Sequence, residues 1–71
     1  MEKSQNKIPR LTLKAWRVNK KLSLKEASKQ LGISEYTLGN YEAGKTFPNV
    51  SMVSKMEKLY GTSYDNIIFL P

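Results

Sequence analysis

Apolar side chains recur along the chain at the spacing of helical turns, and no segment shows the sustained alternation of a β-strand. Leu13 and Trp16 are three residues apart and Leu11 lies just before them, which predicts a first helix over roughly residues 11–20. The Lys20–Lys21 pair at its end suits the negative, C-terminal end of a helix dipole. The pattern therefore begins with one short helix.

The segment SLKE at residues 23–26 has the sequence of a capping box. In this motif the Ser23 side chain accepts from the amide of Glu26, and the Glu26 carboxylate accepts from the amide of Ser23. A second helix is therefore expected to start at Leu24, and Gly32 is suited to end it in a left-handed conformation. Its apolar stripe consists of Leu24, Ala27 and Leu31.

Three further helices are predicted from their end signals. Ser34 is suited to begin a third helix and Gly44 to end it. Because Pro48 blocks continuation, Asn49 is expected to cap a fourth helix that Gly61 ends. Val53, Met56 and Tyr60 are expected to face inward on the fourth helix, and Ser63 is expected to cap a last short helical turn that carries Tyr64, Ile67 and Ile68. The predicted fold class is all-α, with five short helices.

The link between the second and third helices is very short, since it consists of Gly32, Ile33 and Ser34 alone. So tight a link favours two steeply crossing helices, as in a helix-turn-helix, with Gly32 supplying the positive φ of the turn. Small and apolar residues stand where such helices must touch each other and the core, at Ala27, Ser28, Leu31, Gly32, Ile33, Leu38 and Tyr41.

Three segments, LSLKEASKQLGIS, YEAGKTFP and YGTSYDNII, carry a resemblance to a known family. Together they are similar to the helix-turn-helix domains of phage repressors and Cro proteins, the xenobiotic-response-element (XRE) type, over about residues 11–69. The resemblance implies a compact five-helix, lambda-repressor-like domain that binds operator DNA. The sequence departs from the family at Leu24, where a phosphate-contacting Gln is frequent, and at Ser28, which is usually Ala.

Length and composition bound the remaining possibilities. The 71 residues, of which 39% are hydrophobic and 25% charged, allow one small domain, which we assign to residues 10–71 after a polar arm at residues 1–9. The chain has neither Cys nor His, so the usual nucleophiles, bases and zinc ligands are missing, and we expect no enzyme activity, metal or other cofactor. No signal peptide and no run of about 18 apolar residues is visible, which predicts a cytoplasmic protein. The resemblance implies that the cell is bacterial or phage-infected.

Positive charge is concentrated in the N-terminal part of the chain. The net charge is +6, and residues 1–29 hold nine Lys or Arg against two Glu, whereas residues 30–71 hold three Lys against four acidic residues. This asymmetry favours a polyanionic partner such as nucleic acid, and the alternative is a soluble, lysine-rich surface with no such partner.

A helical projection of the third helix separates an inner from an outer side. With Leu38 toward the core, the residues left facing outward or on the flanks are Glu35, Tyr36, Thr37, Gly39 and Asn40. Asn can pair with adenine, Glu can accept from cytosine, and Tyr and Thr can bond base edges or phosphates, so these residues are our candidates for base reading in the major groove. The alternative for Tyr36 and Asn40 is an ordinary solvated surface, and Gly39 either permits close approach of DNA or is merely tolerated.

Glu42 is expected to face inward, where an unpaired carboxylate would be costly. The first helix offers Arg17, and in the resembled family an arginine at the matching place pairs with this glutamate. We therefore predict a structural salt bridge between Arg17 and Glu42, and the competing interpretation makes Arg17 a phosphate contact.

Phosphate contacts are expected on either side of the reading helix. Candidates are Ser23 and Lys25 at the start of the second helix and Lys45 and Thr46 in the loop after the third. The basic residues of the N-terminal segment, Lys3, Lys7 and Arg10, either reach an adjacent groove or belong to a disordered arm, and we favour disorder.

The final segment DNIIFLP is more apolar than a small core requires, so Phe69 and Leu70 are candidates for the contact of a weak homodimer, formed either in free solution or with the assistance of DNA. The sequence shows no effector-binding or catalytic domain, and we expect no small-molecule effector. The leading hypothesis is a sequence-specific transcription regulator of phage or mobile-element type, a repressor that competes with polymerase. The alternative is an antitoxin or adaptor that uses the same helices to hold a protein.

Overall fold

The computed structural model describes residues 9–70, so Lys3, Lys7 and nearly all of the arm assigned to residues 1–9 lie outside the described residues. The elements follow one another in the order β1 (Leu11–Thr12), α1 (Leu13–Asn19), α2 (Leu24–Leu31), α3 (Glu35–Ala43), α4 (Val50–Tyr60), the 3-10 helix η2 (Tyr64–Asn66) and β2 (Ile67–Ile68). The described chain is mostly helical, as predicted. None of its helices is long and apolar enough to cross a membrane.

The prediction of five helices was wrong at the C-terminal end of the fold, and the first helix is shorter than predicted. The first helix begins at Leu13 because Leu11 and Thr12 instead form a short parallel strand pair with Ile67 and Ile68. Thr12 also caps α1, since its side chain accepts from the amide of Ala15 at 3.1 Å. The last helix is one 3-10 turn, because the chain then becomes extended to pair with β1.

The internal helix boundaries agree with their predicted caps. The Ser23–Glu26 capping box opens α2, Ser34 caps α3 through the amide of Thr37, and Asn49 caps α4 through the amide of Met52. The glycines that follow these helices, Gly32, Gly44 and Gly61, all have left-handed backbone conformations. Local hydrogen bonding therefore fixes where α2, α3 and α4 begin and end.

All four α-helices of the described residues, together with β2, contribute to one small core. Its buried apolar side chains are Leu13, Trp16, Ala27, Leu31, Leu38, Met56, Tyr60 and Ile67. The Trp16 indole N–H donates to the carbonyl of Asn66 at 3.0 Å, which joins α1 to η2. Val53, predicted to face inward, is only half-buried, and Ile68 is exposed.

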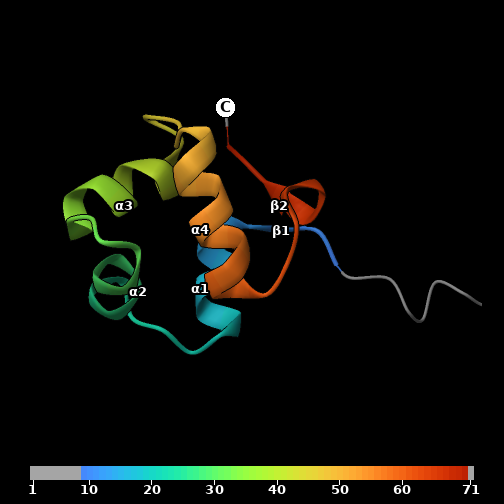
Figure 1. The fold of residues 1–71 in the computed structure, drawn as a ribbon, viewed down its shortest axis with the longest axis horizontal. Helices are drawn as coiled ribbons and strands as arrows, with labels where there is room; N and C mark the ends of the chain where they lie inside the picture. Colours follow the sequence, from blue (N-terminus) through green and yellow to red (C-terminus); the bar gives the residue numbers. More distant parts are fainter. Residues whose placement is uncertain (1–8, 71) are drawn as a thin grey trace, which may run out of the picture.

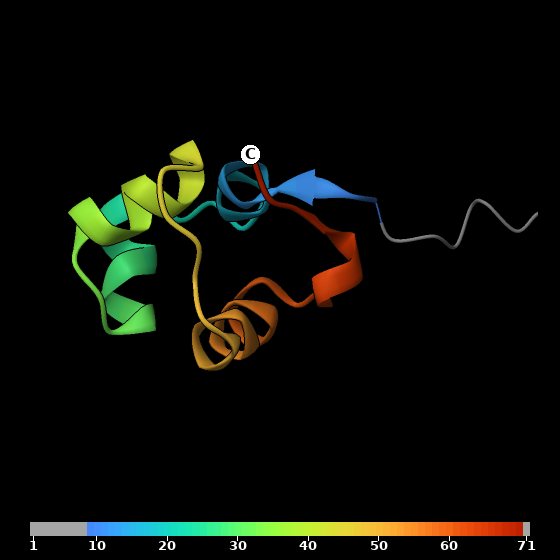
Figure 2. The same ribbon diagram turned by 90° about the horizontal axis from the view of Figure 1, so that it is seen from above.

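The α2–α3 pair and the β1–β2 pair lie at opposite ends of the molecule (Figure 1). In Figure 1, α2 and α3 lie at one end and cross steeply, whereas the β1–β2 pair lies at the other end, near the point where the described chain begins. Figure 2 shows the segment after α3 running from α3 down to α4, so the two helices lie at different levels of the fold. The arrangement leaves the outer side of α3 away from α4 and the strand pair.

Candidate nucleic-acid interface

The α2–α3 link is a sharp turn that hydrogen bonds close. Gly32 has φ 76°, which a residue with a Cβ adopts only with strain, and its amide donates to Lys29 O at 3.2 Å. The Ile33 amide donates to Ser28 O at 3.0 Å. These bonds satisfy two of the last four carbonyls of α2 and close the turn that leads into α3.

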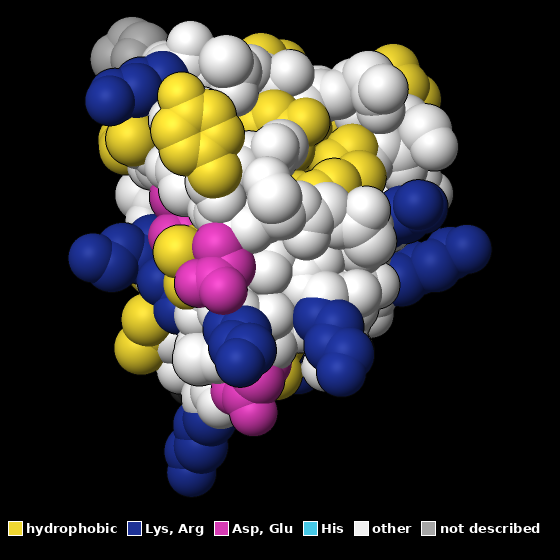
Figure 3. All heavy atoms as spheres, turned by 90° about the vertical axis from the view of Figure 1, so that its left-hand side faces the viewer, with side chains coloured by type: hydrophobic (Ala, Val, Ile, Leu, Met, Phe, Trp, Pro, Cys, Tyr) yellow, Lys and Arg dark blue, Asp and Glu magenta, His cyan; other side chains and the backbone are white. Residues whose placement is uncertain are grey.

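The predicted base-reading side of α3 is open to solvent at its N-terminal end. Tyr36 is 79% exposed and Glu35 is also exposed, whereas Leu38 is fully buried and anchors the helix. Asn40 and Thr37 are half-buried. Figure 3 views the molecule from the side on which α2 and α3 lie in Figure 1, and lysine and arginine side chains project around its margin with acidic side chains among them.

The hydroxyl groups at the start of α3 are already oriented. Ser34 Oγ accepts from the amide of Thr37 at 3.0 Å and donates to Thr37 Oγ1 at 2.9 Å. Because Ser34 supplies this proton, the Thr37 hydroxyl keeps its own proton for an outside acceptor.

Gly39 has unfilled space beside it. A Cβ built at this position would meet no atom of the described chain within 4 Å. Its φ lies outside the left-handed range, so neither space nor backbone conformation demands glycine here. The absence of a side chain at Gly39 is therefore not explained by packing within the protein.

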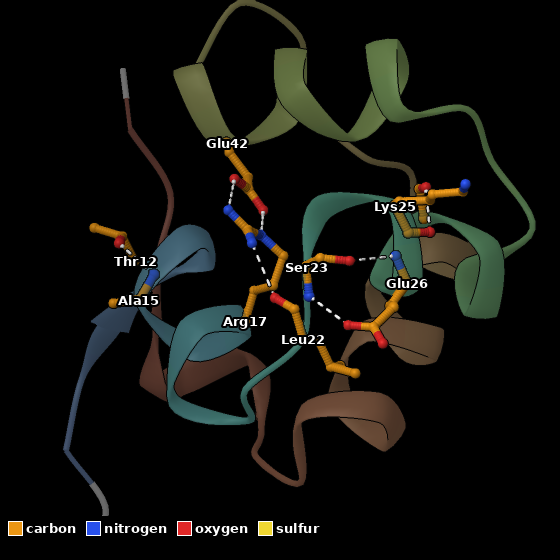
Figure 4. A network of polar contacts seen from close by, with 9 residues as sticks. Thr12, Ala15, Arg17, Leu22, Ser23, Lys25, Glu26 and Glu42 are labelled. Carbon is orange, nitrogen blue, oxygen red and sulfur yellow. Dashed lines mark hydrogen bonds and ion pairs between the residues drawn. The ribbon is translucent and has the colours of Figure 1, made fainter.

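Arg17 and Glu42 form a nearly buried ion pair between α1 and α3. Arg17 Nε donates to Glu42 Oε2 at 2.7 Å and Nη2 donates to Oε1 at 3.2 Å, with the two side chains 11% and 8% exposed. The third guanidinium nitrogen, Nη1, donates to the carbonyl of Leu22 at 3.0 Å. Figure 4 shows the three groups facing one another. The hydrogen bond to Glu42 raises the pKa of Arg17 above its ordinary value, against the opposing effect of burial.

Tyr60 lies in the core near this ion pair. It is fully buried, and its hydroxyl has no hydrogen-bond partner within the described chain. Burial, which has the largest effect, and the negative charge of Glu42 raise the pKa of Tyr60 to about 12, with Arg17 acting in the opposite direction.

The first of the two predicted phosphate sites is already used by the protein itself. Ser23 Oγ accepts from the amide of Glu26 at 3.0 Å, and the Ser23 amide donates to Glu26 Oε1 at 2.8 Å, as Figure 4 shows. This pairing lowers the pKa of the Glu26 carboxyl. Ser23 therefore offers a phosphate only its hydroxyl proton, whereas the neighbouring Lys25 is exposed.

The second predicted phosphate site is the loop after α3. The amides of Lys45 and Thr46 both point to the carbonyl of Asn40, at 2.9 and 3.5 Å, so they close the end of α3. The side chains of both residues are exposed. Contact with an anion here falls to the side chains rather than to these two amides.

A sequence model of the family described as "Helix-turn-helix" matches residues 13–67, which includes all four α-helices and the α2–α3 link. The chain belongs to the helix-turn-helix family. The resemblance to the XRE type, which comprises the repressor and Cro-like domains, is thereby confirmed.

One curated relative of this helix-turn-helix chain is Multiprotein-bridging factor 1c of Arabidopsis thaliana. The two are 36% identical over 52 residues, which is 73% of this chain and 35% of the relative. The chain thus spans about a third of the length of the relative that it matches.

The C-terminal residues considered for a dimer contact belong to an aromatic cluster. The Phe69 ring lies 4.8 Å from that of Phe47 and 5.6 Å from that of Tyr64, between centroids. Phe69 is half-buried, and Leu70 is exposed. Phe47 and Tyr64 remain largely exposed, and with Val50 they line a hollow between α4, η2 and the loop after α3.

Two features of this helix-turn-helix domain escaped sequence reasoning. The aromatic cluster joins residues far apart in the chain. The only sign of it in the sequence is that aromatic side chains occur at positions that would be expected to be exposed. The second feature is a hollow that α1, α2 and α3 form together, with Leu24 and Gly39 on its wall. The sign of this hollow in the sequence was Leu24, which stands where a Gln is frequent in the family.

Proposed function

We propose that this helix-turn-helix domain is a sequence-specific double-stranded DNA-binding transcription regulator. The observation that carries the proposal is the outer side of α3, where Tyr36 is 79% exposed and Gly39 has open space beside it. In this family architecture the second helix of the motif enters the major groove with its N-terminal residues on the base edges.

Base reading is assigned to the residues at the N-terminal end and outer flanks of α3. They are Glu35, Tyr36, Thr37, Gly39 and Asn40. The free proton of the Thr37 hydroxyl supports a role as a donor to DNA. Asn40 would pair with adenine through its amide, and the absence of a side chain at Gly39 would let the DNA approach the helix closely.

Phosphate binding is assigned to side chains on either side of α3. Lys25 at the start of α2 and Lys45 and Thr46 after α3 are exposed, and the Ser23 hydroxyl supplies one further donor. These contacts would fix the register of α3 in the groove, because phosphate contacts position a protein on DNA without reading its sequence.

We further propose that the domain acts as a repressor of phage or mobile-element type in the cytoplasm of a bacterial or phage-infected cell. It binds as a weak homodimer, because one domain of this size covers only a few base pairs. Phe69 and Leu70 are assigned to the dimer contact, supported by the exposed apolar side chains around them. The proposal includes no catalysis and no small-molecule effector.

A second candidate function is that of an adaptor or antitoxin that binds a protein through this domain. Two observations favour it: the name of the relative, Multiprotein-bridging factor 1c, and the exposed apolar hollow lined by Phe47, Val50 and Tyr64. The polar outer side of α3 favours DNA.

A gel shift at two salt concentrations separates the two functions. The probe is a pool of random duplexes with excess unrelated competitor DNA, and the protein is compared with Asn40→Ala. The regulator predicts a retained, competitor-resistant fraction that weakens steeply with salt and is lost in the variant. Absence of any retention at low salt would contradict the DNA-binding function and favour the adaptor.

A further inference from the structure

A hollow of about 390 Å³ opens between α1, α2 and α3 on the flank of the proposed reading helix. Its wall and rim consist of Lys14, Arg17, Leu24, Gly39, Glu42 and Ala43. Arg17 and Glu42 are paired with each other, so they contribute no net charge to it.

The chemistry of the hollow combines an apolar wall with one cation. Leu24 is half-buried and Ala43 is exposed, and both present hydrocarbon. Lys14 is exposed and forms no ion pair within residues 9–70. A matching occupant has a small apolar body beside a negative charge.

The position of the hollow restricts the occupant further. It lies between the first residue of α2 and the flank of α3. The proposed function places the start of α2 at a phosphate and α3 in the adjacent groove, so the hollow faces the DNA backbone between these two contacts. We propose that the hollow receives one sugar–phosphate unit of the DNA backbone. The deoxyribose packs on Leu24 and Ala43, and Lys14 binds its phosphate. This inference rests on the proposed function.

Gly39 acquires a role in this arrangement. Nothing in the described chain lies within 4 Å of a Cβ at this position, so Gly39→Ala adds a methyl group that only the bound strand would meet. The substitution should also strengthen the free helix, because alanine is favoured over glycine in helix interiors. Gly39→Ala therefore separates an effect on DNA from an effect on folding.

The apolar wall has a second consequence, which is discrimination between DNA and RNA. The C2′ of deoxyribose is a methylene, whereas ribose carries a hydroxyl there that would lie against Leu24 without a hydrogen-bond partner. An unsatisfied buried hydroxyl typically costs about tenfold in affinity. One deoxynucleotide in each half-site should therefore be sensitive to the 2′-OH.

The test uses a duplex selected by the wild-type protein from a random pool. Single positions are replaced in turn by a methylphosphonate, which removes one phosphate charge, or by a ribonucleotide. Both replacements should weaken wild-type binding about tenfold at the same nucleotide of each half-site. In Lys14→Gln the methylphosphonate should have no effect at that nucleotide, whereas Lys58→Gln on α4 should keep the wild-type profile. Gly39→Ala should unfold at a higher temperature and bind about fivefold more weakly.

Three results would overturn the inference while leaving sequence-specific DNA binding intact. They are specific binding with the same methylphosphonate profile in wild type and Lys14→Gln, specific binding without a position sensitive to the ribonucleotide, and unchanged or tighter binding by Gly39→Ala. Failure of the wild-type protein to select any duplex would overturn the proposed function, and the inference with it.

Discussion

Arg17 Nε lies 2.7 Å from Glu42 Oε2, and the same guanidinium holds the carbonyl of Leu22 at 3.0 Å. The Arg17 side chain on α1 thereby connects the C-terminal end of α3 with the turn before α2. The ion pair and the hydrogen bond to Leu22 together fix the position of α3 relative to the N-terminus of α2. The geometry of the proposed interface therefore depends on Arg17.

Removing one partner of this ion pair should destabilise the fold. Arg17→Ala leaves Glu42 nearly buried and unpaired, which costs about 3–5 kcal/mol, a large part of the roughly 4–10 kcal/mol available to a chain of this length. Thermal unfolding followed by circular dichroism should show a large drop in midpoint or no cooperative transition.

The matched control replaces both charges together. Arg17→Met with Glu42→Leu should recover much of the lost stability, because a buried pair can often be exchanged for hydrocarbon. If Arg17→Ala unfolds at the wild-type temperature but binds DNA weakly, Arg17 is a phosphate contact and the structural assignment is wrong.

Tyr60 should make stability depend on pH in the alkaline range. Burial and the negative charge of Glu42 raise its pKa from 10.0 to about 12, so the folded state holds the proton more tightly than the unfolded state. The contribution is fully present below pH 10 and is lost as pH rises to about 12, with a magnitude of up to about 2–3 kcal/mol.

Urea unfolding of wild type and Tyr60→Phe between pH 8 and 12 measures this contribution. The hydroxyl has no partner in the described chain, so its removal should cost little near neutral pH. The variant should lose less stability than wild type above pH 10. Parallel curves for the two proteins would show that Tyr60 does not ionise on unfolding as described.

Much of the fold could be predicted because its signals are local. The capping box of Ser23 and Glu26 and the left-handed Gly32 act within one helical turn, so the sequence alone locates the ends of α2. The pairing of Leu11 with Ile67 is different, since it joins two-residue strands more than fifty positions apart and leaves no alternation to detect. Non-local pairing of this kind depends on the whole core.

Asn40→Ala should reduce discrimination between sequences more than it reduces nonspecific binding. Loss of a bidentate contact to adenine costs about 1–3 kcal/mol against the selected site. Competition assays with selected and scrambled duplexes measure the ratio of the two affinities. Ser54→Ala, on the exposed surface of α4, is the control and should retain the wild-type ratio. Equal losses of affinity for the selected and the scrambled duplex would show that Asn40 does not read bases.

Lys45→Gln should weaken binding to selected and scrambled duplexes alike. Removal of one phosphate contact lowers the slope of log affinity against log salt by about 0.9. Fluorescence anisotropy at several salt concentrations gives the slope. Lys55→Gln on α4, also an exposed lysine, controls for net charge. An identical change in slope for both variants would show that Lys45 acts only through long-range electrostatic attraction and does not contact a phosphate.

The candidate interface was only partly predictable. The helical period places Tyr36 outward and Leu38 inward, because both directions depend on α3 alone. The helical period does not reveal that the Lys45 amide donates to the carbonyl of Asn40, or that Leu24 lies on the wall of the same hollow as Gly39. Those relationships require the turn geometry and the crossing of α2 with α3.

Sequence-specific reading by α3 is tested by selecting duplexes from a random pool and footprinting the enriched site. The wild-type protein should enrich one sequence with two-fold symmetric half-sites about one helical turn apart, protected symmetrically. Tyr36→Ala combined with Asn40→Ala should enrich none while keeping its fold. Retention of duplexes by the wild-type protein with no common sequence, or no retention at all, would contradict sequence-specific reading by α3.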